Sequence, residues 1–515
     1  MSVEKRRSEE CCSIAAFYAG RSILVTGGTG FLGKVLLEKL LRSCPDVREI
    51  FLLMRAKGGL SIDDRLRKML QLPLFDKLRE ENPSCLEKLI PVRGDTSVEG
   101  LDIPSVERRV IIERVSVIFH VAANVRFNEN LRKDIFSNTR STRDICILGG
   151  CMKNLVALMH VSTAYAHADK PMIEETMYPA LTDWRNAIRM VESLDESTVQ
   201  TFSSKYLGSM PNTYTFSKRL AEQVINDYSK DLPCAIFRPS IVISTLQDPV
   251  AGWLDNFNGP VGLLIGGGKG ILRVARVEAD VAGNFLPVDL AIKIMLTATW
   301  KRGLKTVTKD SSVHVYNGTS DGISRISMKE LIALGFKKTA EMPLEGIVWY
   351  PRTMVTNSAL LHYVLTMILH LLPALIIDTA LRVSGRRPML LNLQRKVYCS
   401  MVQLSYFVHN EWTFQNSKAR SVLETEVPSA EREIFGYDYK TFSVEDYFGD
   451  CLMGAKRYLL NEWDPSRLEI VKRHYDRMKR IDQIFNVCAI GLIIWIVAKA
   501  GIVSHIFNSL RWLVY

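Results

Sequence analysis

The sequence predicts an α/β protein built on a Rossmann-type, doubly wound parallel sheet, followed by a mostly helical C-terminal domain and a hydrophobic tail. Between residue 21 and about residue 300, short apolar runs alternate with helical patterns, which is typical of a parallel sheet with helices on both faces. A glycine-rich turn follows the first of these runs. The length of 515 residues also exceeds one ordinary hydrophobic core, so we expect more than one compact unit.

The predicted strands are short and continuously apolar, as expected for a sheet that is covered on both faces. They are Ser22–Val25, Ile50–Met54, Leu89–Val92, Val115–Phe119, Leu155–His160 and Cys234–Phe237. Helical patterns such as Leu32–Leu41 and Tyr214–Tyr228 lie between them.

Changes of composition divide the chain into four predicted parts. Residues 1–20 form an N-terminal segment, and residues 21–345 form the sheet domain, which we expect to bind a nucleotide and a substrate. Residues 346–465 are rich in aromatic and basic residues and predict a separate helical domain, which begins near Pro343 and Pro351. Residues 466–515 contain a basic stretch followed by an apolar tail.

Charge and cysteine content exclude several classes of protein. The net charge of +11 is mild for this length and favours anionic partners such as phosphates or membrane head groups. There is no nucleic-acid-binding signature, so we expect no nucleic-acid partner. The ten cysteines are scattered without a CxxC motif, which argues against a metal site and against a secreted disulfide scaffold. Residues 1–16 lack the apolar core of a secretory signal peptide.

Two apolar runs approach the length of about 20 residues that a spanning helix needs. The first, Ala359–Ile377, contains two histidines and a proline, and we expect a buried core helix there, with a membrane contact as the alternative. The second comprises Ile484–Ala498, then Lys499, then Ala500–Phe507. It follows a basic stretch that would stay in the cytosol, so we expect a membrane segment at this end. Lys499 would have to extend to the interface or face a partner.

The glycine-rich turn predicts a dinucleotide site. After the first strand the chain reads TGGTGFLG, and a helical stripe follows. In this pattern Gly27 allows the tight turn, Gly30 lets the backbone approach a diphosphate, and Gly33 lets the helix pack closely on the strand. The diphosphate would bind N–H groups at the start of the helix. The expected contacts are therefore Gly27, Thr29, Gly30, Phe31, Leu32 and Gly33; the alternative is a glycine turn without a ligand.

The type of residue at the end of the second strand distinguishes NAD sites from NADP sites. Roughly 20 residues after the glycines, NAD sites place an acid and NADP sites a base. The chain has Arg55 there and no acid, so we expect NADPH, with Arg55 on its 2′-phosphate. The alternative is a solvated strand-end arginine. Asp95, after the third strand, could accept from the adenine amino group or simply form a turn. Ala122, after the fourth strand, would let the backbone pass beside the cofactor.

Tyr214 and Lys218 predict carbonyl reduction. They lie four residues apart at the start of a helical pattern and therefore share one helix face. Hydride transfer leaves negative charge on oxygen, and a tyrosine could supply the proton if a nearby ammonium lowered its pKa. Lys218 could also hold the nicotinamide ribose. A YxxxK pattern alone is common by chance; downstream of a dinucleotide turn it is informative.

A hydroxyl group that orients the carbonyl would complete this site. Thr163 is slightly preferred to Ser162, at the end of a predicted strand, where open α/β sheets build their sites. His160 and Tyr165 are expected to pack rather than to catalyse. Arg238 follows another strand, in an Arg-Pro loop that could close over the nicotinamide.

These elements resemble extended short-chain dehydrogenase/reductases, and longer stretches resemble the fatty acyl-CoA reductase family. The stretches are Thr29-Gly-Phe-Leu-Gly-Lys-Val-Leu-Leu-Glu-Lys-Leu, Val125-Arg-Phe-Asn-Glu-Asn-Leu, His160-Val-Ser-Thr-Ala-Tyr and Gly252-Trp-Leu-Asp-Asn-Phe-Asn-Gly-Pro. Arg382-Val-Ser-Gly-Arg-Arg-Pro and the apolar tail are similar to the C-terminal part of that family. Gly28, Asn124, Ala251 and Ser217 depart from frequent family residues, but none of these changes removes a catalytic group.

The resemblance implies that two NADPH reduce a long-chain fatty acyl-CoA to a primary alcohol, with release of CoA, for wax or ether-lipid metabolism. It implies that Tyr214 donates the proton, that Lys218 lowers the pKa of Tyr214, and that Ser162 or Thr163 binds the carbonyl. It also implies an intracellular membrane location, in peroxisome or endoplasmic reticulum, with the catalytic domain facing the cytosol. The long segment between Thr163 and Tyr214 could build part of an acyl or CoA site.

Two other functions remain open at this point. The same scaffold could act on a sterol or a nucleotide sugar, which a substrate screen would reveal. The chain could also be a membrane protein that keeps the cofactor fold only as a binding module, although the presence of both Tyr214 and Lys218 argues against this.

Overall fold

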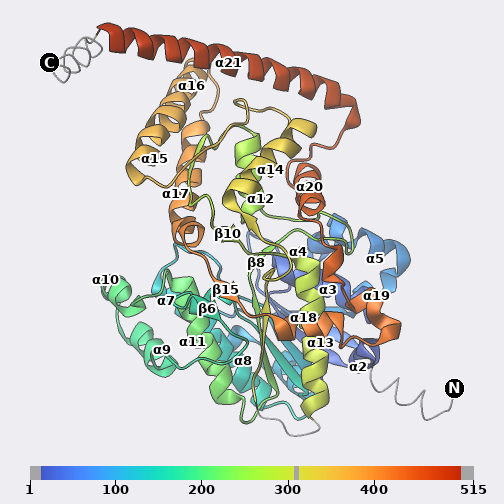
Figure 1. Ribbon diagram of the computed structural model, residues 1–515. Coiled ribbons are helices and arrows are strands. Elements are labelled where there is room, and N and C mark those ends of the chain that lie inside the picture. The colour runs from blue at the N-terminus through green and yellow to red at the C-terminus, as the bar shows by residue number, and fades with distance from the viewer. Residues whose placement is uncertain (1–12, 307–311, 500–515) are drawn as a thin grey trace. The chain divides into compact units, whose positions relative to one another are not determined.

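The computed structural model describes residues 13–306 and 312–499, which form two compact units (Figure 1). Of these residues, unit 1 contains 13–261, 280–306, 312–328 and 402–459. Unit 2 contains 262–279, 329–401 and 460–499. The units do not follow the boundaries expected from composition, because part of the predicted helical domain, residues 402–459, packs into the sheet unit.

Unit 1 is built on a seven-stranded parallel sheet with the order β12-β7-β5-β4-β1-β2-β3. The strands are β1 (Ser22–Thr26), β2 (Glu49–Met54), β3 (Leu89–Arg93), β4 (Val115–His120), β5 (Ala157–Val161), β7 (Cys234–Pro239) and β12 (His314–Gly318). The predicted fold class is confirmed, and six of these strands were expected. The seventh, β12, was not predicted, because His314 and Asn317 interrupt its apolar pattern.

Helices cover both faces of the sheet, and side chains of successive strand residues enter two separate cores. On one face, α3 (Phe31–Ser43) and α13 (Val288–Thr306) pack with Ile23 and Val25 of β1. On the other, α8 (Ser141–Gly150) and α11 (Thr213–Tyr228) pack with Leu24. This arrangement explains why the strands are apolar throughout.

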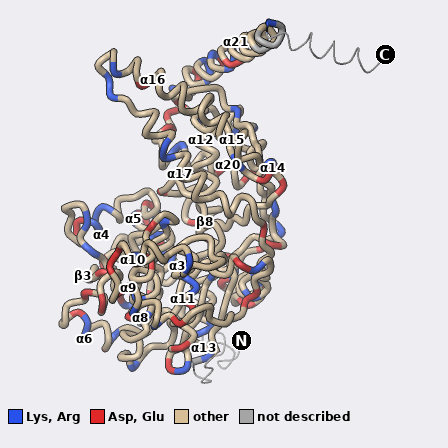
Figure 2. Tube along the Cα trace, turned by 90° about the vertical axis from the view of Figure 1, so that its left-hand side faces the viewer, with Lys and Arg blue, Asp and Glu red and all other residues tan. Residues whose placement is uncertain are grey.

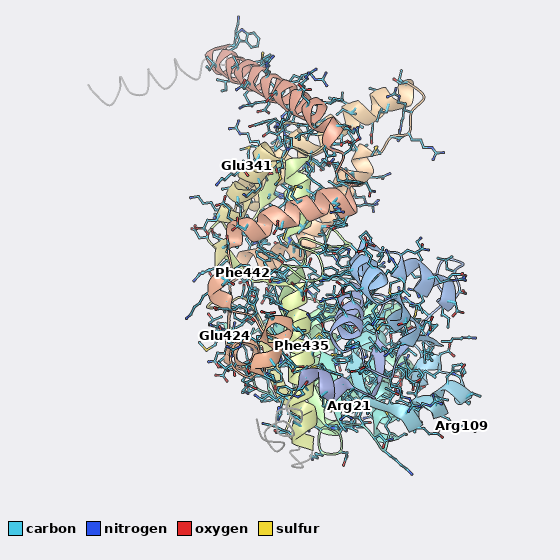
Figure 3. The ribbon with its side chains drawn as sticks, turned by 90° about the vertical axis from the view of Figure 1, so that its right-hand side faces the viewer. Arg21, Arg109, Glu341, Glu424, Phe435 and Phe442 are labelled. Carbon is cyan, nitrogen blue, oxygen red and sulfur yellow. The ribbon has the colours of Figure 1, made fainter. Side chains whose placement is uncertain are left out.

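The returning segment 402–459 belongs to the first of these cores. Its helix α18 (Ser417–Glu424) packs on α13, and the carboxylate of Glu175 accepts hydrogen bonds from the backbone N–H groups of Asn317, Lys418 and Ala419. Phe435, labelled in Figure 3, is completely buried in the core beside α3. These contacts attach the segment to the β12 edge of the sheet.

Unit 2 is mostly helical. It contains α12 (Pro260–Gly268) from residue 262 on, α14 (Met328–Glu341) from residue 329 on, α15 (Ala359–Thr366), the π-helical turn η6 (Met367–Leu371), α16 (Leu372–Val383), the first part of α17 (Leu390–His409) and α21 (Leu468–Lys499). A short parallel pair, β9 (Val274–Arg276) and β14 (Met354–Thr356), lies among them. The long helix α21 is held by Trp349, whose Nε1 donates to Asp482 at 2.5 Å.

The expectation of a buried core helix at Ala359–Ile377 is wrong. The helix runs over Ala359–Val383, is long and apolar enough to cross a membrane, and is mostly exposed. Histidines in an apolar run suggested a core, but only one stripe of this helix is buried. The second apolar run is helical up to Lys499, with its described large apolar side chains exposed, and Ala500–Phe507 lie outside the described residues.

Candidate active site

The glycine-rich turn lies between β1 and α3, and its geometry requires glycine at two positions. Gly27 has φ +75°, and a Cβ there would lie 2.6 Å from the backbone nitrogen of Ala122. A Cβ at Gly33 would lie 2.2 Å from the carbonyl oxygen of Gly27. The Ala122 backbone therefore passes directly beside the turn, and its expected position beside the cofactor stays a prediction.

The start of α3 offers backbone donors to an anion. A helix leaves the N–H groups of its first turn without intrahelical partners, and here these belong to Phe31, Leu32 and Gly33. The N-cap is Gly30, which supplies no side chain to occupy them. The ring of Phe31 stacks on Trp253 at 5.6 Å, so any contact of Phe31 with a diphosphate would come from its backbone.

Two arginines lie beside this turn. Arg55 pairs with Asp95 at 3.1 Å, and its side chain is more than half exposed. Arg65, in α4 (Ile62–Leu70), donates to the hydroxyl of Thr29 at 3.3 Å and to the carbonyl oxygen of Arg55. The pKa of Arg65 is lowered by burial and by the neighbouring Arg55 charge. Arg65 was not predicted from the sequence, although its position one helical turn into the helix after the second strand could have indicated it.

Tyr214, Lys218 and Thr163 come together at the carboxyl edge of the sheet. Asn212 caps α11 by accepting from the backbone N–H of Thr215 at 2.9 Å, which fixes where the helix begins. The hydroxyl groups of Tyr214 and Thr163 are hydrogen-bonded to each other. The ammonium of Lys218, only 1 % exposed, donates to the carbonyl oxygen of Val161 at 2.5 Å.

The electrostatics of this pair differ from the expectation. Burial raises the pKa of Tyr214 to about 12, although the hydrogen bond with Thr163 acts to lower it. Burial lowers the pKa of Lys218 to about 7, against the opposing effect of the Glu222 carboxylate. The predicted lowering of the tyrosine pKa by Lys218 is therefore not found in this structure, because desolvation dominates both groups.

Ser162 and Arg238 are engaged elsewhere, in a buried cluster around Glu222. Ser162 donates to Glu222 at 2.6 Å, and the guanidinium of Arg238 binds both carboxylate oxygens at 2.7 and 2.8 Å. Burial acts to raise the pKa of Glu222, but Arg238 and His167 hold it well below its usual range. Arg238 is fully buried and also donates to the carbonyl oxygens of Glu174 and Thr176. The guanidinium of Arg238 is therefore engaged within the protein, and the expected contact of this residue or its loop with the cofactor stays a prediction.

Two buried histidines lie behind Lys218. The Nε2 of His160 is 3.4 Å from the Lys218 amine, and its ring lies 5.3 Å from that of His120. His120 bridges the hydroxyl groups of Thr26 and Thr142 at 2.8 and 3.1 Å. Burial lowers the pKa of His120 to about 3, assisted by the Lys218 charge. Both rings are thus neutral packing groups, as expected for His160.

An aromatic wall, defined by Phe127, Tyr165, Phe407 and Trp412, extends from Tyr214. Phe127 stacks on Tyr214 with ring centroids 5.7 Å apart and lies 5.3 Å from Phe407. Phe407 in turn contacts Tyr165 at 5.2 Å, and Tyr165 contacts Trp412 at 5.4 Å. Phe407 and Trp412 come from the returning segment, and the sequence analysis did not connect them with the site.

The segment between Thr163 and Tyr214 includes two helices, α9 (Trp184–Ser193) and α10 (Glu196–Leu207). The first of them packs on α11, with Trp184 Nε1 donating to Asp227 at 2.9 Å. The amide of Asn130 donates to Glu196 at 2.7 Å, which connects α10 to the loop after β4.

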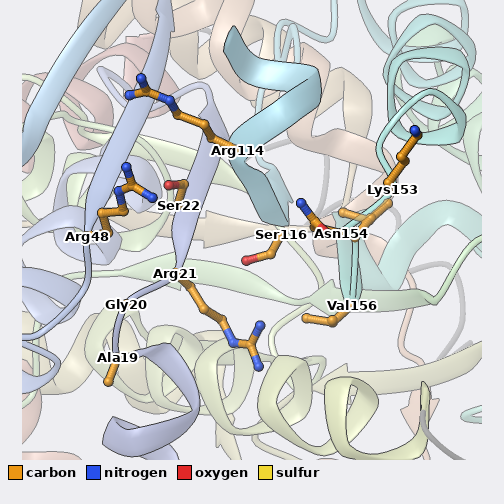
Figure 4. A pocket seen from close by; sticks show the side chains of 11 residues that line it. Ala19, Gly20, Arg21, Ser22, Arg48, Arg114, Ser116, Lys153, Asn154 and Val156 are labelled. Carbon is orange, nitrogen blue, oxygen red and sulfur yellow. The ribbon is translucent and has the colours of Figure 1, made fainter.

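A basic cleft of about 660 Å³ lies at the opposite edge of the sheet (Figure 4). Ser22 and Ser116, at the starts of β1 and β4, line it together with Arg21, Arg48 and Arg114. The residues of the candidate site follow the carboxyl ends of the same strands, so this cleft is not part of it.

Comparisons with known proteins identify the family. Two family descriptions, both "male sterility protein", match residues 25–295 and 369–462. Fatty acyl-CoA reductase 1 of Xenopus laevis is 37% identical over 484 residues, covering 93% of this chain and 92% of its own length. The human fatty acyl-CoA reductase 1 is 36% identical over 508 residues, covering 98% and 97%. The Drosophila melanogaster fatty acyl-CoA reductase wat is 34% identical, covering 90% and 88%.

Solved structures share the fold. The terminal R domain from the myxalamid PKS-NRPS biosynthetic pathway is 19% identical with a TM-score of 0.54, covering 85% of this chain and 91% of that chain. The reductase domain of a nonribosomal peptide synthetase from Mycobacterium tuberculosis is 18% identical with a TM-score of 0.54, covering 90% and 97%.

The relatives match nearly the whole chain, and the site described above has the parts of a nicotinamide-dependent reductase. The chain is an oxidoreductase that belongs to the fatty acyl-CoA reductase family.

Proposed function

We propose that this protein reduces a long-chain fatty acyl-CoA to the primary alcohol with NADPH and releases CoA. The observation that carries this proposal is the hydrogen-bonded pair Tyr214–Thr163 at the carboxyl edge of the sheet, with Lys218 one helical turn away and the glycine turn at the same edge. Membership in the fatty acyl-CoA reductase family supports the acyl-CoA substrate.

The residues at the glycine turn fit a phosphorylated dinucleotide. Gly27 and Gly33 keep the space free that a Cβ would fill, and the start of α3 presents N–H groups to a diphosphate. The guanidinium of Arg65 binds the backbone carbonyl of Arg55 and is close enough to be affected by the Arg55 charge, and an anion such as a 2′-phosphate would relieve this repulsion. Asp95 neutralises only Arg55, so this set favours NADPH over NADH.

The residues of the site suit two successive reductions. NADPH supplies the hydride when it is bound. The hydroxyl of Thr163 can orient the thioester carbonyl, and Tyr214 holds a proton at its hydroxyl oxygen for the alkoxide that develops. The resulting thiohemiacetal loses CoA by breaking its carbon–sulfur bond, which leaves an aldehyde. A second hydride and a second proton convert this aldehyde into the alcohol.

The aromatic wall favours an aliphatic substrate. Phe127 and Phe407 are half-buried and lie next to Tyr214, so methylene groups adjacent to the reacting carbonyl could rest against their rings. Sugars and nucleotides would instead need a site rich in hydrogen-bonding side chains. This wall therefore supports a fatty chain over a nucleotide sugar.

The apolar end of α21 supports attachment to an intracellular membrane, in peroxisome or endoplasmic reticulum, with the catalytic unit in the cytosol. Exposed basic residues, among them Arg473, Arg477 and Arg480, precede exposed apolar residues such as Ile490 and Trp495. A basic flank keeps its side of a membrane segment in the cytosol. A membrane location would give the enzyme access to poorly soluble acyl chains for wax or ether-lipid synthesis.

The reaction itself is tested by stoichiometry. Purified protein supplied with palmitoyl-CoA should oxidise two NADPH for each CoA released and should yield hexadecanol, and Tyr214→Phe should abolish both. Product analysis by gas chromatography and a thiol assay for CoA measure this directly. Turnover of a sterol or a nucleotide sugar while acyl-CoAs remain inert would refute the proposal.

The cofactor preference is tested at Arg65. Arg65→Ala should raise the KM for NADPH by roughly 10- to 100-fold, because a charge-assisted phosphate contact contributes about 1.5–3 kcal/mol, and should leave the KM for NADH unchanged. Arg67→Ala is the matched control, since Arg67 lies on the same helix with its side chain 75% exposed and should change neither value. An equal loss with both cofactors would show that Arg65 supports the turn only structurally.

Adjacent hydroxyl groups provide a test of the catalytic assignment. Thr163→Ala should lower kcat by roughly 10²- to 10³-fold, as expected for removal of one group that stabilises the oxyanion. Ser162→Ala should lower kcat by less than about tenfold, because the hydroxyl of Ser162 is bound to the charged Glu222 and its loss mainly costs about 1.5–3 kcal/mol of stability. Thermal denaturation separates the two effects, and the reverse order of the kcat values would make Ser162 the catalytic hydroxyl.

The burial of Lys218 predicts the pH dependence. With a pKa lowered to about 7, Lys218 is an ammonium below that pH and loses its charge above it. Because kcat/KM for NADPH reports groups of the free enzyme, it should be constant at low pH and fall as pH rises through about 7. Lys218→Arg, which keeps its charge, should be slower but lack this decline. An unchanged decline in this variant would assign it to another group.

A further inference from the structure

The helix Ala359–Val383 of unit 2 has one buried stripe and is otherwise exposed. Its mean hydropathy reaches 2.1 over 18 residues. The buried residues are Thr366, His370, Ala374 and Asp378, which lie four positions apart and therefore on one side of the helix. Composition alone does not distinguish a helix that spans a membrane from a helix that packs on the protein along one side.

Hydrogen bonds attach the buried stripe to unit 2. The Nε2 of His370 accepts from the backbone N–H groups of Arg273 and Val274 at 2.9 and 3.2 Å. The carboxylate of Asp378 accepts from the first three N–H groups around the start of α17, at Met389, Leu390 and Leu391, at 2.9 to 3.0 Å. A spanning position would break these bonds and transfer an imidazole and a carboxylate into hydrocarbon, which is costly. The helix is thus held along the surface of unit 2.

The opposite side of this helix is apolar and free of contacts with the described residues over much of its surface. Ile368, Leu372 and Ile376 are 52%, 51% and 61% exposed. Each lies two positions after a buried residue, about 200° around an α-helix. The same surface includes further exposed residues: Leu360, Leu361, Val364 and Leu375. We call the seven residues of these two sets the outer face.

Cations flank the outer face at one end. Gly385, with φ +72°, follows the end of α16, and Arg382, Arg386 and Arg387 around it are exposed. Figure 2 shows the loop after α16 with its basic residues in blue. The outer face itself contains no charged residue. This is the pattern of an amphipathic helix that lies in a bilayer interface, with cations at the level of anionic head groups.

We propose that the outer face lies flat in the interface of a bilayer that contains anionic lipids, with Arg382, Arg386 and Arg387 on the lipid phosphates. It forms a membrane contact separate from the C-terminal segment and does not depend on which substrate the enzyme reduces.

Photocrosslinking of the full chain in vesicles tests this proposal, with a phospholipid that carries a diazirine in its acyl chain. Trypsin cuts after Arg352 and Arg382 and not between them, so one peptide, residues 353–382, carries the whole outer face and all of the helix except Val383. The tail yields a different peptide, residues 481–499. In vesicles of phosphatidylcholine and phosphatidylserine, mass spectrometry should find lipid adducts on both peptides.

Variants separate the outer face from the tail. The triple change Ile368→Glu, Leu372→Glu and Ile376→Glu should remove the adducts on 353–382 and keep those on 481–499. The control carries the same change at Val106, Ile147 and Leu181, which are exposed apolar residues of unit 1, and should keep both. The double variant Arg386→Gln and Arg387→Gln should lower the adducts on 353–382 by about an order of magnitude only when phosphatidylserine is present.

Two results would overturn the proposal. Wild-type adducts confined to 481–499 would show that the tail alone meets the lipid. A dimer in light scattering that the triple variant converts to a monomer, with no adducts on 353–382, would show that a second copy covers the outer face. NADPH oxidation with palmitoyl-CoA in detergent, measured on the same samples, reports the proposed reaction independently of either outcome.

Discussion

The buried carboxylate of Glu222 holds together the edge of unit 1 that carries the candidate active site. It lies one helical turn after Lys218 on α11 and binds Ser162 after β5, His167 in the following turn and Arg238 near the end of β7. A buried charge without a partner would be strongly destabilising, so these groups have to meet in one arrangement. That arrangement fixes the register of α11 against β5, and with it the contact between Tyr214 and Thr163.

The same burial determines the chemistry available to the site. Desolvation favours the neutral forms of Lys218 and Tyr214, and the carboxylate of Glu222 opposes this effect for the lysine. The pKa of Lys218 is therefore about 7, so this lysine changes its charge around neutral pH. Tyr214, with a pKa of about 12, keeps its proton there. In the proposed reaction, Tyr214 would therefore keep its proton until the surroundings of Lys218 change, as on binding of the cofactor.

Features that depend on residues close together in the chain were predicted from the sequence, and contacts between distant segments were not. Continuous apolar runs predicted six strands, and the spacing of Tyr214 and Lys218 predicted one helix face. The strand β12 was missed because its pairing with β7 decides it, not its composition. The pairing of Arg238 with Glu222 was not predicted, because Glu222 lies on another element. The helix Ala359–Val383 was misjudged because hydrophobic composition does not reveal which side is attached.

The return of the chain to unit 1 explains why composition misplaced the domain boundary. The helix α17 begins in unit 2 and ends in unit 1. There its residue Phe407 contacts Phe127, which stacks on Tyr214. Trp412, a few residues later, donates to the carbonyl oxygen of Ala168 and packs on Tyr165. The part of this helical region that supplies the wall beside Tyr214 belongs to the sheet unit, because removing it would expose that wall to water. The two family descriptions that match this chain in separate stretches therefore meet in one site.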